Sequence, residues 1–119
     1  MTSKHEKLVK DYSEPHILRQ SLQYFCDVPQ IIEVYTEQSL REIFGIDSDK
    51  LPDICAITEN DYIYVGEVKG KYLNNNVKKA QKQVIRYMKT IRDEGWNCTG
   101  FIIVGYYWEL IEDTSMLLN

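Results

Sequence analysis

An apolar strand, a long amphipathic helix and a second apolar strand follow one another in the C-terminal half of the chain. This succession limits the possible folds more than any other feature. The pattern predicts strands at residues 62–69 and 99–105, with a helix at residues 77–94 between them. Two strands joined through a helix usually lie parallel, with the helix on one face of their sheet. We therefore expect a mixed sheet flanked by helices.

The preceding segment adds a hairpin to this unit. Only the polar residues 59–61 separate the strand at 62–69 from another apolar run at 53–58, and so short a connection predicts an antiparallel pair. A further strand is expected at residues 31–36.

Two helices complete the prediction. Ser39 and Gly45 have the residue types that begin and end a short helix, and Ser13-Glu14-Pro15 is typical of a helix start, with Ser13 as the cap. The predicted order is α-β-β-β-α-β, with a minor helical insertion before the second strand. It forms one α/β domain over residues 1–119, in which residues 1–12 are a mobile or loosely helical N-terminal extension.

Composition narrows the setting of this domain. The 119 residues suffice for one hydrophobic core. No apolar run approaches the roughly 20 residues of a membrane span, and the charged N-terminus does not resemble a secretory signal. Cys26, Cys55 and Cys98 are odd in number and contain no CxxC pair, which argues against a disulfide framework. We expect an intracellular protein with no membrane partner.

Charged residues stand at the ends of the predicted hairpin strands, where apolar residues would be expected. Side chains alternate along a strand, so Glu67 and Lys69 share one face. A three-residue turn would place Asp53 directly opposite Glu67, whereas a two-residue turn would place it on the other face. Convergence of the three charges therefore requires an odd turn or a bulge, and Gly66 is the candidate for a bulge.

Two adjacent carboxylates repel each other unless they share a cation. Carboxylate oxygens suit Mg²⁺, which keeps several waters for a phosphate substrate, and a neighbouring lysine can hold or deprotonate a water molecule. The arrangement therefore predicts metal-assisted phosphodiester hydrolysis. A surface salt bridge between Lys69 and one carboxylate is the alternative.

The sequence Pro52-Asp53, followed after thirteen residues by Glu67-Val68-Lys69, resembles the motif of the PD-(D/E)XK nucleases. The resemblance covers about residues 13–105 and implies a restriction-endonuclease-like core. It implies that Asp53, Glu67 and the Val68 carbonyl bind Mg²⁺ or Mn²⁺, and that Lys69 orients or activates the attacking water. It also implies that DNA is cleaved to 5′-phosphate and 3′-hydroxyl ends.

The helix after the lysine strand carries a second resemblance. Gln83 and Tyr87 are similar to the QxxxY element of RecB-type exonucleases, which implies that they support the site. Relatives with an iron–sulfur cluster need four cysteines, so no such cluster is expected here. The short chain looks more like the small stand-alone members, such as Holliday-junction resolvases or viral and mobile-element nucleases.

A further site carboxylate often comes from the first helix in this family. Glu14 is the candidate, although complementing the helix dipole is an equally good interpretation of it. Glu33 is a weaker alternative. We expect His5 and His16 to be surface residues.

The segment 67–92 is strongly basic. It holds eight lysines and arginines and one acid, a net +7 within a chain of net charge −4, so the remainder carries −11. A solvated helix face is one interpretation, and an electrostatic footprint for phosphates is the other. Under the second, the residues that hold the phosphates are Lys71, Lys78, Lys79 and Lys82.

Two other classes of function stay open. One is a catalytically inactive nuclease-fold domain that binds nucleic acid or protein. The other is a small α/β protein that works only through protein contacts, because residues 106–111, "YYWELI", could form a homodimer patch or close the core. The sequence does not distinguish exonuclease from endonuclease, or one form of DNA or RNA substrate from another.

Overall fold

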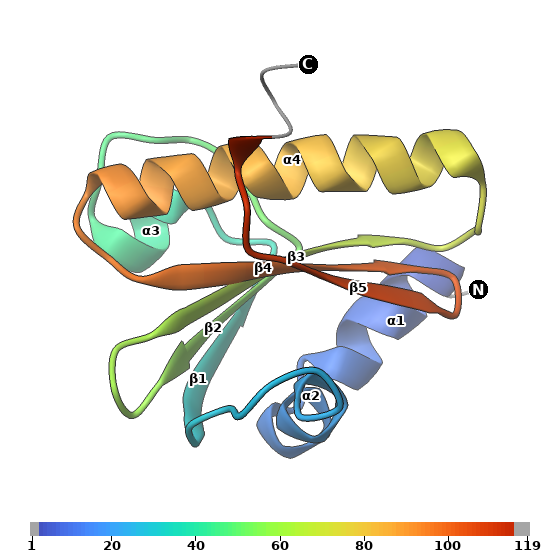
Figure 1. The fold of residues 1–119 in the computed structure, drawn as a ribbon, viewed down its shortest axis with the longest axis horizontal. Helices are drawn as coiled ribbons and strands as arrows, with labels where there is room; N and C mark the ends of the chain where they lie inside the picture. Colours follow the sequence, from blue (N-terminus) through green and yellow to red (C-terminus); the bar gives the residue numbers. More distant parts are fainter. Residues whose placement is uncertain (1–2, 116–119) are drawn as a thin grey trace.

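The computed structural model describes residues 3–115, which form one five-stranded sheet with helices on both faces (Figure 1). The strands follow the chain order across the sheet, and only β3 and β4 are parallel neighbours. The predicted mixed α/β sheet is therefore confirmed. The strands are β1 (Ile31–Thr36), β2 (Ile54–Thr58), β3 (Ile63–Lys69), β4 (Cys98–Val104) and β5 (Tyr107–Ile111).

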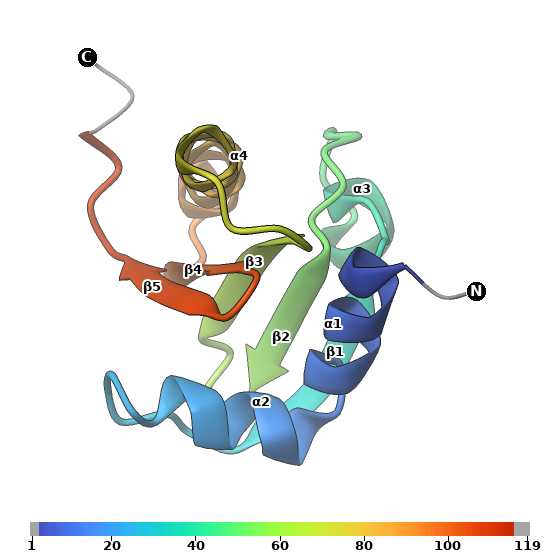
Figure 2. The same ribbon diagram turned by 90° about the vertical axis from the view of Figure 1, so that its right-hand side faces the viewer.

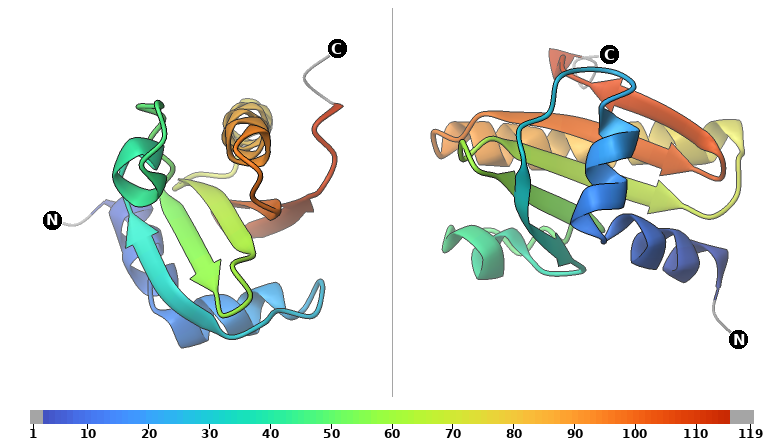
Figure 3. Two further views of the ribbon diagram at one scale, coloured as in Figure 1. Left: turned by 90° about the vertical axis from the view of Figure 1, so that its left-hand side faces the viewer. Right: turned by 90° about the horizontal axis from the view of Figure 1, so that it is seen from below.

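The four helices divide between the two faces of this sheet. Figure 2 shows α3 and α4 on one face and α1 and α2 on the other, and the views in Figure 3 agree. The helices are α1 (Lys4–Tyr12), α2 (Pro15–Leu22), α3 (Leu40–Phe44) and α4 (Asn74–Asp93). No helix within residues 3–115 is both long enough and apolar enough to cross a membrane.

Each face of the sheet has its own apolar core because side chains alternate along the strands. Ile63 and Val65 of β3 pack with the α3–α4 layer, whereas Tyr64 and Val68 pack with the α1–α2 layer. Both cores contain fully buried side chains from the central strands. Glu67 occupies the same alternating series as Ile63 and Val65, so its position faces α4.

Of the two alternatives predicted for the N-terminal segment, the mobile one is wrong and the helical one agrees with the structure. Within the described part of residues 1–12, α1 begins after Ser3, whose hydroxyl accepts from the Glu6 N–H, and it buries Val9 against the sheet. The predicted helix cap is also wrong. Ser13 ends α1, and the cap of α2 is Glu14.

Residues 106–111 include β5, the antiparallel edge strand next to β4. The Trp108 ring stacks on Phe101 with centroids 5.7 Å apart and meets Tyr12 edge-on at 5.0 Å. Trp108 therefore helps to close the core between the sheet and the α1–α2 layer. Tyr106, by contrast, is 85% exposed in the β4–β5 turn.

Candidate active site

The hairpin register brings the charged strand ends together. Ile54 pairs with Gly66 and Ile57 with Ile63, and the Thr58 N–H donates to the Tyr62 carbonyl across a turn of residues 59–61. Extending this register by one residue sets Asp53 opposite Glu67. The predicted three-residue turn is therefore confirmed, with Asp61 adopting a positive φ of 61°.

Gly66 is not a bulge, because β2 and β3 pair without a shift in register. Its role is to let another strand's side chain approach. A Cβ atom at Gly66 would lie 2.3 Å from the Phe101 ring. The glycine therefore allows a fully buried aromatic ring from β4 to lie against β3, one residue before Glu67.

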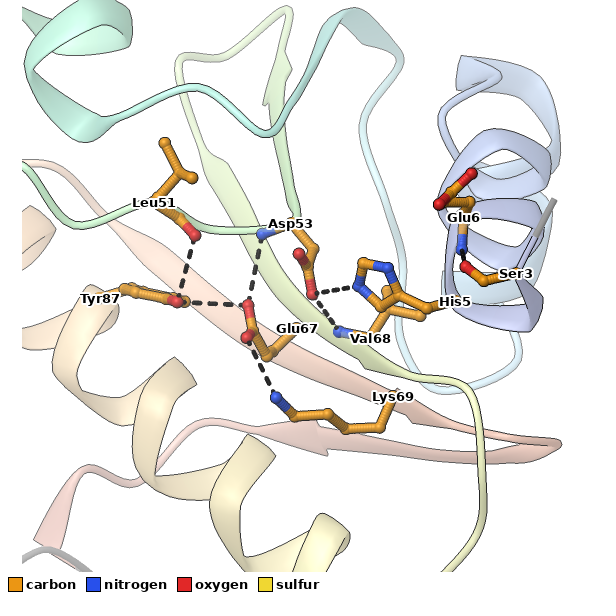
Figure 4. Close-up of polar contacts among 9 residues, drawn as sticks. All are labelled: Ser3, His5, Glu6, Leu51, Asp53, Glu67, Val68, Lys69 and Tyr87. Carbon is orange, nitrogen blue, oxygen red and sulfur yellow. Dashed lines mark hydrogen bonds and ion pairs between the residues drawn. The ribbon is translucent and has the colours of Figure 1, made fainter. Parts of the chain in front are cut away.

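Glu67 is a buried carboxyl group with three polar neighbours (Figure 4). Its Oε1 accepts from the Asp53 N–H at 3.3 Å, and its Oε2 lies 3.7 Å from the Lys69 ammonium nitrogen. The Glu67 side chain is 6% exposed and the Lys69 side chain 27%. This ion pair is not a surface salt bridge, because its carboxylate is almost wholly removed from water.

Tyr87 of α4 closes the site from the helix side. Its hydroxyl lies 3.2 Å from Glu67 Oε1 and 3.3 Å from the Leu51 carbonyl oxygen, both of which accept from it. Burial, together with the nearby Glu67 carboxyl, raises the pKa of Tyr87, so the hydroxyl keeps its proton. The contact fixes the Glu67 carboxyl relative to the segment that leads into Asp53.

Asp53 immediately precedes the first residue of β2 and lies beside the last residues of β3. Its Oδ2 accepts from the Val68 N–H at 2.8 Å and lies 3.3 Å from His5 Nε2. Figure 4 shows the imidazole reaching the Asp53 carboxylate from α1, opposite the side on which Glu67 lies. The His5 side chain is 36% exposed, as expected for a surface residue, and the structure adds a contact with Asp53 that the sequence did not indicate.

The Val68 carbonyl lies at the same strand end. Val68 is beyond the last β2–β3 pair, that of Ile54 with Gly66, and its N–H donates to the Asp53 carboxylate at 2.8 Å. Its carbonyl could therefore supply an oxygen ligand beside Asp53.

The electrostatics of the site follow from the close approach of Asp53 and Lys69 to the Glu67 side chain. Burial and, to a smaller extent, the Asp53 charge together raise the pKa of Glu67 from its ordinary 4.5 to about 7, while Lys69 opposes the shift. A carboxyl group in this state exchanges its proton near neutral pH, and a cation beside it would favour the charged form. Asp53, Glu67 and the Val68 carbonyl together offer the hard oxygen donors that suit Mg²⁺.

Two predicted residues lie apart from this cluster. The Glu14 carboxylate accepts from the N–H groups of His16 and Ile17 at the start of α2, so the structure favours the helix-end interpretation over a role at the metal. Glu33 on β1 is exposed and accepts from the Tyr35 hydroxyl. Neither has a polar contact with Asp53 or Glu67.

Gln83 precedes Tyr87 by one turn of α4. Its Oε1 is buried and has no hydrogen-bond donor among the described residues. Gln83 is predicted to support the site, but its Oε1 forms no hydrogen bond with Asp53, Glu67 or Lys69. The predicted phosphate-binding lysines are all exposed, one in the β3–α4 connection and three on α4: Lys71, Lys78, Lys79 and Lys82.

Within residues 3–115 no three His, Cys, Asp or Glu side chains stand close enough to form a ready-made metal site. The donor set therefore depends on a backbone carbonyl besides the side chains. Comparisons with protein-family models, with curated proteins and with solved structures find no match to this chain. The resemblance to PD-(D/E)XK nucleases stays a prediction that rests on the residues themselves.

Proposed function

We propose that the protein is a Mg²⁺- or Mn²⁺-dependent nuclease that hydrolyses phosphodiester bonds of DNA, leaving 5′-phosphate and 3′-hydroxyl ends. One observation carries the proposal. A buried carboxyl group, Glu67, shares a strand end with Asp53 and Lys69, where apolar residues would stabilise the fold better. A buried carboxyl group with a raised pKa beside other charged groups is typical of sites that do chemistry.

The residues divide the work by position. Asp53, Glu67 and the Val68 carbonyl supply the oxygen donors for the cation, and His5 adds a nitrogen beside Asp53. The bound cation would polarise the scissile phosphate and lower the pKa of the attacking water. Lys69 directs that water and offsets negative charge on the phosphate, and Tyr87 positions Glu67. The water oxygen bonds to phosphorus as the bond from phosphorus to the 3′ oxygen breaks.

Isosteric substitutions test the proposal. Asp53→Asn and Glu67→Gln keep the shape of the site but remove carboxylate oxygens, so we expect each to abolish metal-dependent cleavage. The assay presents linear, circular, single-stranded and four-way-junction DNA with Mg²⁺, Mn²⁺ or EDTA. Glu59→Gln is the matched control, because it makes the same change at an exposed position in the turn of the same hairpin. Undiminished cleavage by pure Asp53→Asn protein would refute the assignment.

A second candidate function is binding of nucleic acid without hydrolysis. The observation that favours it is the absence of three converging ligand side chains within residues 3–115. A binding domain of this kind would retain DNA with a strong dependence on salt and show no turnover with any divalent cation. The same panel separates the two candidates.

A further inference from the structure

Two exposed tyrosines stack on each other beside the candidate site. Tyr72 follows β3 and Tyr106 lies in the β4–β5 turn. Their ring centroids are 5.9 Å apart, with 21° between the ring planes. Tyr72 is 43% exposed and Tyr106 85%. Tyr107 meets the Tyr72 ring edge-on at 5.6 Å. A planar aromatic surface is thus presented to solvent.

The backbone holds this tyrosine pair in place. The Gly105 N–H donates to the Lys69 carbonyl at 2.8 Å, which ties the turn before Tyr106 to the end of β3. Gly105 has a φ of 64°, and a Cβ there would lie 3.3 Å from the Tyr72 nitrogen. The Asn76 side chain also donates to the Lys71 carbonyl at 2.8 Å. A ligand would therefore meet a surface that needs little ordering.

The pair lies close to the proposed chemistry. Val104 pairs with Lys69 in the parallel β3–β4 ladder, so the β4–β5 turn and the β3–α4 connection leave the same end of the sheet (Figures 1 and 2). Two residues separate Lys69 from Tyr72, so their Cα atoms are at most ~11 Å apart. The exposed Lys71 stands between them.

We infer that the Tyr72–Tyr106 pair stacks with an unpaired base of a DNA strand whose adjoining phosphate lies in the Asp53–Glu67–Lys69 site. An aromatic surface next to a lysine matches the alternating base and phosphate of a single strand, since every base has a stacking face. In a duplex those faces are covered by neighbouring base pairs. The inference rests on the proposed function and names its substrate class as DNA with an unpaired segment.

A second copy of the chain fits the surface less well. A stable dimer of standard size buries about 800 Å² on each partner, whereas one aromatic side chain provides roughly 150–250 Å². Among residues 3–115, the large exposed apolar side chains in the β3–α4 connection and the β4–β5 turn are Tyr72, Leu73 and Tyr106. A two-fold contact would also bring the two copies of Lys71 toward each other.

Binding in EDTA tests the inference without requiring cleavage. Fluorescence anisotropy is measured with a labelled single strand, an abasic strand of equal length, a closed-circular duplex as competitor, and an RNA strand. We expect Tyr106→Ala to weaken single-strand binding at least about fivefold, and Tyr106→Phe to retain it. Tyr24→Ala is the matched control, because Tyr24 is 90% exposed in the turn after α2, and its binding should equal that of the wild type. The abasic strand should bind equally well to wild type and Tyr106→Ala.

Several results would overturn the inference: unchanged single-strand binding by Tyr106→Ala, an equal loss on the abasic strand or the duplex, or binding of RNA alone. Sedimentation of a wild-type dimer that Tyr106→Ala dissociates, with DNA binding intact, would assign the surface to a second copy. Cleavage assays with Mg²⁺ keep the two proposals distinct. If wild type cleaves DNA while Tyr106→Ala binds normally, only the stacking inference fails. If Tyr106→Ala loses binding but wild type never cleaves, only the hydrolytic function fails.

Discussion

Among the residues of the candidate site, Glu67 is the one whose burial costs the most free energy. Its side chain lies between the sheet and α4 with 6% of its surface exposed, and its pKa is raised to about 7 by burial and by Asp53. A group whose pKa is higher in the folded protein than in the unfolded chain stabilises the fold at low pH. That contribution is lost as the pH rises through the folded pKa.

The resulting pH dependence can be measured on the metal-free protein. Between pH 4.5 and about 7 the folded state holds more protons at Glu67 than the unfolded chain does. The free energy of unfolding should therefore fall with rising pH across this window, by at most ~3 kcal/mol. Urea denaturation in EDTA measures it. Glu67→Gln, which has no titrating proton, should flatten the curve, and an unchanged slope in that variant would contradict the assignment.

Tyr87 allows stability and positioning to be separated. Tyr87→Phe removes the hydroxyl that lies 3.2 Å from Glu67 Oε1, and we expect a loss of about 1 kcal/mol in stability together with a marked loss of cleavage. Tyr62→Phe is the matched control, because it removes a hydroxyl that is hydrogen-bonded to Thr99 rather than to the site. It should lose similar stability and retain cleavage. Equal cleavage by both variants would show that Tyr87 acts only in packing.

The cluster could be predicted from sequence only where local rules apply. Asp53, Glu67 and Lys69 follow from strand alternation and turn length, whereas the site role of Tyr87 was implied by its resemblance to the QxxxY element. His5 could not be found in this way, because its place depends on how α1 packs. Its backbone nitrogen would lie 3.0 Å from a Cβ on Gly70, a contact made across 65 residues of sequence. Glu14 was a candidate for the metal by analogy with the family, and its hydrogen bonds at the start of α2 favour the alternative role at the helix end.

At the scale of elements, β3 is the central strand, and its packing against β4 depends on one missing side chain. Phe101 lies over Gly66, where a Cβ would approach the ring to 2.3 Å. We expect Gly66→Ala to reduce stability by about 1–3 kcal/mol, because the buried ring must move. Phe101→Leu should cost less in the Gly66→Ala background than in the wild type. A double-mutant cycle by chemical denaturation measures this coupling, and additive effects would argue against the contact.

The elements themselves were largely predictable, since β1, α3, β2, β3, α4 and β4 all follow from periodicity, caps and turns. Ser39 and Gly45 bound α3 as expected. The parts that the sequence left open are α1, which could be mobile or loosely helical, and β5, whose residues could close the core or form a homodimer patch. Charged residues alternate with few apolar ones in α1, and its single buried residue, Val9, gives almost no periodic signal. The role of β5 depends on the partners of Trp108, which come from α1, β4 and the turn after α2.

At the scale of the whole molecule, the excess positive charge lies in one segment and the excess negative charge in the rest of the chain. The segment 67–92 carries +7 within a protein of net charge −4, and it runs from the site along α4. An acidic remainder repels DNA everywhere except along this segment, so binding should be oriented as well as dependent on salt.

A triple substitution tests the orientation. Replacing Lys78, Lys79 and Lys82 by alanine should reduce the slope of log affinity against log salt by about two for a single strand. The triple variant Lys7, Lys10 and Lys50→Ala changes the net charge equally, at exposed positions outside the segment, and should leave most of that slope intact. Equal slopes in the two variants would show that only total charge matters.

The turn at residues 59–61 limits which insertions and deletions the sequence can accept during evolution. The three-residue turn puts Asp53 opposite Glu67 at the far end of the hairpin. The pairing register set at the turn therefore determines whether the two carboxyl groups share one face. A one-residue insertion or deletion that shifts the β2–β3 register would turn Asp53 toward the opposite face, with every site residue still present in the sequence. A two-residue shift would restore the facing. If the proposed hydrolysis is retained, changes of register at this turn should therefore come in even steps, and a one-residue shift should mark a lineage that has lost it.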